Sequence, residues 1–166
     1  MLILMDVVGV RVEMPSNQPI VLLKEMEGSR FLPIWIGAVE ATAIAFAQQG
    51  IEPPRPLTHD LMATLITTLD ATLTAIHLTS IESGIFYASL QLRNQSAKLL
   101  TISARPSDAI ALALRCKSNI LASSELLDEV GIEMPAQGID GEVGSIQEIE
   151  RFKEFLDQIN PEDFAK

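Results

Sequence analysis

Hydrophobic and polar residues alternate along residues 2–14, and this two-residue period predicts a β-strand. Four apolar side chains share one face of the strand and two charged ones the other: Val8, Val10, Val12 and Met14 against Arg11 and Glu13. Residues 20–27 and 30–36 predict two more strands, joined by a tight turn at residues 28–29. The chain is therefore expected to begin with a three-stranded meander.

The pattern then becomes helical. Residues 38–49 are apolar nearly all round and end at Gly50, which predicts a buried helix with a glycine at its C-terminal end. A stiff, proline-rich linker leads to a second helix over residues 59–69, with Thr58 as the expected N-terminal cap. The apolar stripe of this helix is formed by Leu57, Leu61, Met62, Leu65, Ile66 and Leu69.

The second half of the chain has the same order of elements. Residues 71–80, 84–93 and 98–104 predict three strands, and residues 106–117 predict a second apolar helix. In the middle strand four apolar side chains face the same way: Phe86, Ala88, Leu90 and Leu92. The predicted fold class is α+β.

A shift of 68 positions aligns residues 32–47 with residues 100–115, and five of the sixteen pairs are identical. The same shift places Glu40 on Asp108. We interpret this as a weak internal duplication. Two related halves, each a strand meander followed by a helix, are then packed as one domain.

The C-terminal part completes the expected organisation. A short strand near residues 119–122 and a helix over 123–130 close a domain that spans residues 1–130. Residues 131–144 are acidic and rich in glycine, which indicates a flexible linker. Residues 145–166 predict a C-terminal amphipathic helix that begins with a capping box. The apolar stripe of that helix needs a partner.

Composition narrows the function classes. The chain has 166 residues, enough for one domain, and a net charge of -10, which disfavours simple binding to nucleic acid. Hydrophobic residues make up 48% of the chain, so a large surface for self-association is expected. The single cysteine, Cys116, cannot form an internal disulfide, and no apolar run is long enough to span a membrane. These features indicate a cytoplasmic protein without a membrane partner.

One acid lies near the start of each of three predicted helices: Glu40, Asp60 and Asp108. A carboxylate in the first turn of a helix interacts favourably with the positive end of the helix dipole. Pro106 likewise suits the first helical position, where its missing N–H has no hydrogen bond to lose. Helix-start chemistry alone therefore explains every acid in this set.

A second interpretation rests on their placement, because helices that are otherwise apolar each hold one acid at the N-terminal end. If these ends converge, Glu40, Asp60 and Asp108 are candidate ligands for Mg²⁺ or Mn²⁺. His59, Asp60 and Asp108 are the candidate catalytic residues, with His59 as proton carrier.

Two arginines next to these helix starts, Arg55 and Arg105, are candidate clamps for a phosphate. Ser107 joins them as a candidate substrate-binding residue. It has no histidine nearby in the sequence, so a capping role suits it better than that of a nucleophile. The adjacent His59 and Asp60 diverge by about 100° on a helix and do not form a dyad.

Three segments, "LPIWIGAVEATAIA", "PRPLTHDLM" and "ARPSDAIALALR", resemble the bifunctional nuclease family in order and spacing. The resemblance covers roughly residues 1 to 130. It implies a small α+β domain that pairs as a dimer and cleaves DNA and RNA, as plant members do. The motif residues are Gly37, Glu40, Arg55, Pro56, His59, Asp60, Arg105, Pro106, Ser107 and Asp108.

One position departs from the family pattern, because Ser103 stands where the family often has aspartate. If that acid binds metal, the departure weakens the nuclease. Two hypotheses therefore stay open. The first is a metal-assisted nuclease that hydrolyses phosphodiester bonds. The second is a non-enzymatic dimeric module that binds a small anion or a protein partner.

Overall fold

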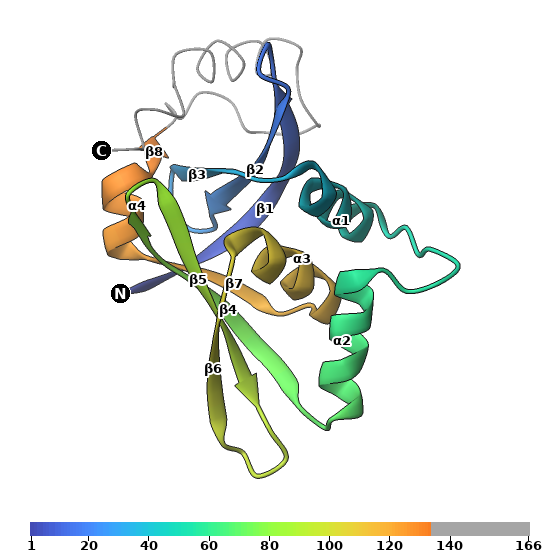
Figure 1. Ribbon diagram of the computed structural model, residues 1–166. Coiled ribbons are helices and arrows are strands. Elements are labelled where there is room, and N and C mark those ends of the chain that lie inside the picture. Colours follow the sequence, from blue (N-terminus) through green and yellow to red (C-terminus); the bar gives the residue numbers. More distant parts are fainter. Residues whose placement is uncertain (134–166) are drawn as a thin grey trace.

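Residues 1–133 are described by the structure, a computed structural model with a mixed α+β fold (Figure 1). Its elements in chain order are β1 (Leu2–Glu13), β2 (Gln18–Glu25), β3 (Arg30–Trp35), α1 (Ala38–Gln49), α2 (Thr58–Thr68), β4 (Thr72–Glu82), β5 (Ile85–Arg93), β6 (Leu99–Ala104), α3 (Pro106–Cys116), β7 (Asn119–Ser123), α4 (Ser124–Val130) and β8 (Ile132–Glu133). The predicted fold class is confirmed. Most of the predicted linker and the whole predicted C-terminal helix lie outside the described residues.

All eight strands belong to one sheet, in the order β6-β5-β4-β7-β1-β2-β3-β8. The meanders β1–β2–β3 and β4–β5–β6 are both antiparallel, and β7 joins them, antiparallel to β1 and parallel to β4. Each meander is followed by a helix. The short strand predicted near residues 119–122 is confirmed as β7, although its place between the two meanders was not predicted. The internal duplication itself stays a prediction.

Helix α3 is the centre of the helical layer. It packs against α1 on one side and α2 on the other, and it also contacts β4, β5 and β7 (Figure 1). Five consecutive residues of α3 are fully buried: Ala109, Ile110, Ala111, Leu112 and Ala113. This packing brings the N-terminal ends of α1 and α3 and the first turn of α2 close together. No helix in the described residues is long and apolar enough to cross a membrane.

Several local predictions are confirmed. Gly50 ends α1 in the left-handed conformation, and Pro106 occupies the first turn of α3. The helix predicted over residues 123–130 is α4, and the Ser123 hydroxyl at its start accepts a hydrogen bond from the Leu126 N–H. On β5 the residues Ala88, Leu90 and Leu92 are buried as expected.

The predicted apolar face of β1 is wrong. Met5 and Val7 are buried, whereas Val8 is 45% exposed and Val12 is 55% exposed. The register of β1 against β2 shifts between Val7 and Gly9. A bulge of this kind changes which alternate residues face the core, so a single two-residue period cannot describe the whole strand.

The buried faces of two helices differ in part from those expected, although Met62 and Ile66 of the predicted α2 stripe do pack against the core. The leucines of the predicted α2 stripe are exposed: Leu57, Leu61, Leu65 and Leu69. The inner face of α2 carries Met62, Ala63 and Ile66 together with the buried His59. In α1, Val39 is 77% exposed, so this helix is not buried all round.

Candidate functional site

Three helices contribute to a group of charged side chains around one guanidinium. Arg105 donates from Nη2 to Glu40 Oε1 over 2.8 Å and from Nε to Asp108 Oδ2 over 2.7 Å. The other oxygen of Asp108, Oδ1, lies 2.9 Å from His59 Nε2. We call Glu40, His59, Arg105 and Asp108 the Arg105 cluster. The structure thus brings together four of the residues that the sequence singled out.

The first turns of α1 and α3 place the two acids of the cluster. Glu40 is the third residue of α1, after the N-cap residue Gly37, and Asp108 is the third residue of α3, after the N-cap residue Arg105. Neither N-cap side chain caps its helix. A Cβ atom at residue 37 would lie 2.3 Å from Glu40 Oε2. Glycine therefore leaves room for the carboxylate that Arg105 holds.

The pair of His59 and Asp108 is largely shielded from solvent. His59 is 6% exposed although it lies in the second position of α2. Burial raises the pKa of Asp108, but hydrogen bonds from Arg105 and then from His59 outweigh it and hold the pKa below its ordinary value. Asp108 is therefore an ionised acceptor at neutral pH, and His59 Nε2 must be the donor.

The second ring nitrogen of His59, Nδ1, has no hydrogen-bond partner within residues 1–133. It is not sealed from solvent, because no buried side-chain nitrogen or oxygen in this part of the chain lacks a partner. Asp108 thus holds one side of the imidazole while the other side stays available for proton exchange.

The guanidinium of Arg105 faces outward. Its side chain is 67% exposed, whereas those of Glu40 and Asp108 are 16% and 26% exposed. Its remaining nitrogen, Nη1, bonds to no described residue. A positive group with a free N–H fork at the surface suits an anion such as a phosphate oxygen.

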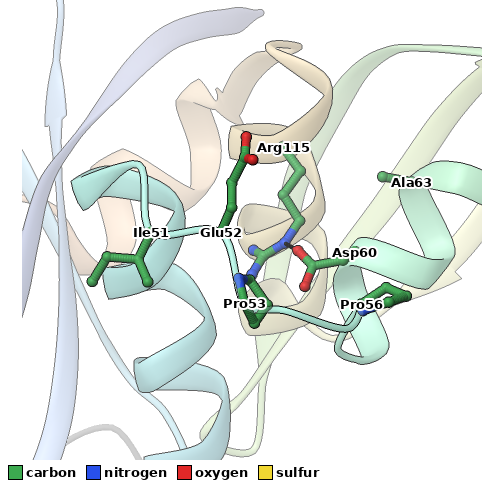
Figure 2. A pocket seen from close by; sticks show the side chains of 7 residues that line it. All are labelled: Ile51, Glu52, Pro53, Pro56, Asp60, Ala63 and Arg115. Carbon is green, nitrogen blue, oxygen red and sulfur yellow. Dashed lines mark hydrogen bonds and ion pairs between the residues drawn. The ribbon is translucent and has the colours of Figure 1, made fainter.

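Asp60 does not join the Arg105 cluster. Its Oδ1 accepts a hydrogen bond from Arg115 Nε over 2.6 Å, and its Oδ2 accepts the Leu57 N–H over 2.9 Å (Figure 2). The hydrogen bond from Arg115 lowers the pKa of Asp60, against the opposing effect of burial. Asp60 thus holds the first turn of α2. The predicted cap Thr58 is wrong, because α2 begins at Thr58 and its N-cap is Leu57.

A cavity of about 340 Å³ lies beside this second pair. Figure 2 shows it between the linker after α1, the first turns of α2 and the end of α3. Its lining residues are Ile51, Glu52, Pro53, Pro56, Asp60, Ala63 and Arg115. None of these belongs to the Arg105 cluster, which lies at the surface rather than in this hollow.

The other two candidate substrate-binding residues occupy different environments. Arg55 is exposed on the linker before α2 and makes no hydrogen bond or ion pair with another described residue. Ser107 is the second residue of α3 and is 7% exposed, so it has little surface to offer a ligand. It is not the N-cap of α3, which is Arg105.

The acids of the cluster do not form a ready site for Mg²⁺ or Mn²⁺. Arg105 occupies the place between Glu40 and Asp108, and Asp60 is bonded to Arg115. Over residues 1–133 no group of three His, Cys, Asp or Glu side chains is arranged to hold a metal ion. A divalent cation bound between Glu40 and Asp108 would therefore compete with Arg105 for Glu40 Oε1 and Asp108 Oδ2.

Sequence reasoning missed two relationships. It separated His59 from Asp60 correctly but did not pair His59 with Asp108, 49 positions away. A signal was present, because His59 is in helical phase with Met62, Ala63 and Ile66 on the inner face. Arg115 was also missed, although it is the one charged residue between positions 109 and 116.

Known proteins resemble this chain over most of its length. The profile of the family described as "Bifunctional nuclease domain" matches residues 21–135. Two proteins of Mycobacterium tuberculosis, "Uncharacterized protein MT1877" of strain CDC 1551 / Oshkosh and "Uncharacterized protein Rv1829" of strain H37Rv, are each 46% identical to it over 160 residues. Each alignment covers 95% of this chain and 95% of the relative.

Proposed function

Because the chain belongs to the bifunctional nuclease family, we propose that it hydrolyses phosphodiester bonds in DNA or RNA at the Arg105 cluster. The observation that carries this proposal is the arrangement of an imidazole, a carboxylate and an exposed guanidinium at bonding distance. The imidazole and the carboxylate can carry out the proton transfers that phosphodiester cleavage needs. The guanidinium is the cation that stabilises the negative charge of the phosphate.

His59 is the proposed proton carrier. Asp108 accepts from Nε2 and stabilises the imidazole when it becomes positively charged. Nδ1 then takes the proton of the attacking hydroxyl, from water or from a ribose 2′-hydroxyl, and returns it to the leaving oxygen. Asp60 has a different role in this proposal, because both of its oxygens already hold the first turn of α2.

Arg105 is the proposed phosphate clamp. Its Nη1 is directed to no described side chain, so it is available to a phosphate oxygen while Nε and Nη2 keep their carboxylates. Arg55 is assigned to the flanking nucleic acid through its charge, whereas the buried Ser107 is given no contact with the substrate. Because the chain carries a net charge of -10, we propose weak, salt-sensitive contact with the substrate.

Mg²⁺ or Mn²⁺ has no step in this chemistry, because Arg105 already occupies the position between Glu40 and Asp108. We therefore expect cleavage of single-stranded DNA or RNA to persist in EDTA, within about tenfold of the rate with Mg²⁺ or Mn²⁺. Initial rates of highly purified protein in the three conditions measure this.

Glu40→Gln is the matched variant for the cation experiment, because it removes a candidate metal ligand and keeps a hydrogen-bond acceptor for Arg105. We expect it to alter the rate by the same factor with and without the cation. An absolute requirement for Mg²⁺ or Mn²⁺ that Glu40→Gln weakens would contradict this, and would favour Glu40 and Asp108 as metal ligands after all.

A second candidate function is a non-enzymatic module that binds a small anion. The pairing of Glu40 and Asp108 with Arg105 favours it, because within the Arg105 cluster the exposed guanidinium is then the charged group that is open to an anion. Measuring the binding of inorganic phosphate together with the cleavage of nucleic acid distinguishes the binding module from the nuclease. Binding that is lost in Arg105→Met, in a protein that cleaves neither DNA nor RNA, would support the module.

We also propose that the protein is a cytoplasmic homodimer that pairs through the edge of its sheet. Strand β6 lies at one edge of the sheet, and its residues Leu99, Leu100 and Ile102 are 63%, 37% and 48% exposed. An uncharged edge of this kind is suited to pairing with a second copy. The lone cysteine, Cys116, is consistent with a reducing compartment.

For Ile102→Lys we expect the dimer to dissociate more readily, with a dissociation constant raised at least about tenfold, because a charge then lies at the apolar edge. Light scattering after size-exclusion chromatography over a range of protein concentrations measures the change. Ile51→Lys, at a residue 44% exposed on the linker, is the control. Equal masses for the two variants at every concentration would exclude this edge as the interface.

A further inference from the structure

Arg115 carries a largely buried guanidinium that bonds to groups on three helices. It lies in the last turn of α3, and its side chain is 10% exposed. Nε donates to Asp60 Oδ1 of α2 over 2.6 Å. Nη1 donates to the carbonyl of Ala43 in α1 over 3.0 Å and to that of Ala111 in its own helix over 2.8 Å. Figure 2 shows the guanidinium directed from α3 to Asp60.

Such a group is expensive to bury unless its partners are complete. Asp60 supplies the opposite charge, and the two carbonyls supply acceptors in different directions. A planar guanidinium serves three acceptors at fixed angles, which an ammonium cannot do from one position. Arg115 therefore fixes the relative placement of α1, α2 and α3 rather than only neutralising Asp60.

The contacts between α2 and α3 have a particular geometry. Two consecutive residues of α2, His59 and Asp60, bond to residues of α3 that are seven positions apart, Asp108 and Arg115. Seven residues are about two helical turns, or roughly 10 Å along the axis. Attachment at both points restrains α2 from sliding and from turning about its own axis. The contact of His59 alone would hold α2 to α3 by a hydrogen bond at one point only.

Arg115 is linked to the Arg105 cluster through α2 and through α1. Asp60 also accepts the Leu57 N–H, so its position sets the first turn of α2, which carries His59. Ala43 lies three residues after Glu40 on α1, whose carboxylate meets Arg105. Arg115 thus holds each helix that brings a side chain to the cluster, without touching the cluster itself.

We propose that Arg115 is a positioning residue, which keeps His59 against Asp108 by anchoring α2 and α1 to α3 through Asp60 and the Ala43 carbonyl. An effect of Arg115 on catalysis rests on the proposed nuclease function, whereas its effect on the position of His59 does not. Arg115→Met removes the charge and all three directed bonds. Arg115→Lys keeps the charge but not the fork.

The test follows the ring of His59 by nuclear magnetic resonance. The chain has two histidines, so His77 on β4 is an internal reference. In the unaltered protein we expect the proton to stay on Nε2 of His59. In Arg115→Met we expect this proton to exchange with solvent at least tenfold faster and the ring nitrogen shifts to indicate mixed tautomers. Arg115→Lys should fall between the two, and His77 should not change.

Arg30→Met is the matched control for general loss of stability. Arg30 also forms two ion pairs, with Glu25 at 3.0 Å and Asp128 at 2.7 Å, but it lies on β3 away from the Arg105 cluster. We expect this variant to leave the ring of His59 unchanged. If Arg115→Met does not fold, Asp60→Asn weakens the same anchor while keeping the shape of the side chain, because it removes the charge and leaves one acceptor oxygen for the two hydrogen bonds of Asp60.

Two results would overturn the inference. One is a folded Arg115→Met or Asp60→Asn variant in which His59 keeps its slow exchange and single tautomer. The other is Arg30→Met disturbing His59 as strongly as Arg115→Met does. Cleavage assays on the same samples add a second readout, in which kcat should fall more than KM changes. A protein without any nuclease activity would refute the proposed function alone, because the resonance measurement still decides the role of Arg115.

Discussion

Replacing Asp108 by asparagine is expected to lower kcat for phosphodiester cleavage at least about 100-fold, the range typical of lost acid–base catalysis. Asparagine has nearly the same shape but no charge, so it cannot stabilise a positively charged imidazole. It also presents an amide in place of one of the oxygens that bind His59 and Arg105. Single-turnover rates on labelled single-stranded DNA and RNA measure the effect.

A contaminating nuclease is the main hazard in this experiment, so the control is a carboxylate of the same type elsewhere. Asp128 on α4 has a side chain 71% exposed and pairs with Arg30. Asp128→Asn, purified in parallel, should cleave at the rate of the unaltered protein. Equal activity in Asp108→Asn and Asp128→Asn would mean that cleavage comes from another site or another protein.

Much of the fold was predictable from the sequence because local signals and the fold agree. Gly50 and Pro106 mark helix ends through backbone properties that do not depend on distant residues. The alternation in β5 gave the buried face correctly, since only one of its faces is consistently apolar. Fold class therefore followed from element order and period alone.

The choice between two apolar faces was not predictable in the same way. Helix α2 carries leucines on one face and Met62, Ala63 and Ile66 on another, and the face with the leucines is the one exposed. In β1 the register against β2 shifts between Val7 and Gly9, so one two-residue period does not describe the whole strand. The spacing of hydrophobic residues shows that a face is apolar. Which of two apolar faces becomes buried depends on elements distant in sequence that pack against it.

The cluster of charged residues was predictable in part for a related reason. That Glu40 and Asp108 open comparable helices is a local fact, and it led to the expectation that their ends meet. Local sequence does not determine which arginine pairs with each acid. Arg105 bonds to Glu40 across 65 positions of the chain, and Arg115 bonds to Asp60 across 55. Since all three acids are carboxylates near the start of a helix, their spacing in the sequence could not separate Asp60 from the other two.

Leu112→Ala is expected to lower the free energy of unfolding by about 2–5 kcal/mol, the range for deleting most of a buried leucine side chain. Leu112 is fully buried in α3, the helix against which α1, α2 and three strands pack. Since the total stability of a domain is about 5–15 kcal/mol, this single change removes a large share of it. Urea unfolding followed by circular dichroism measures the difference.

Leu69→Ala is the matched substitution, because Leu69 is 74% exposed at the end of α2. It should change the free energy of unfolding by less than about 0.5 kcal/mol, as is usual for surface positions. Similar values for the two variants would mean that α3 is not the packing centre. The positions of Asp108 and Arg115 would then need another support, since both are carried by this helix. A large difference would establish that the cluster is built on the most firmly packed element of the fold.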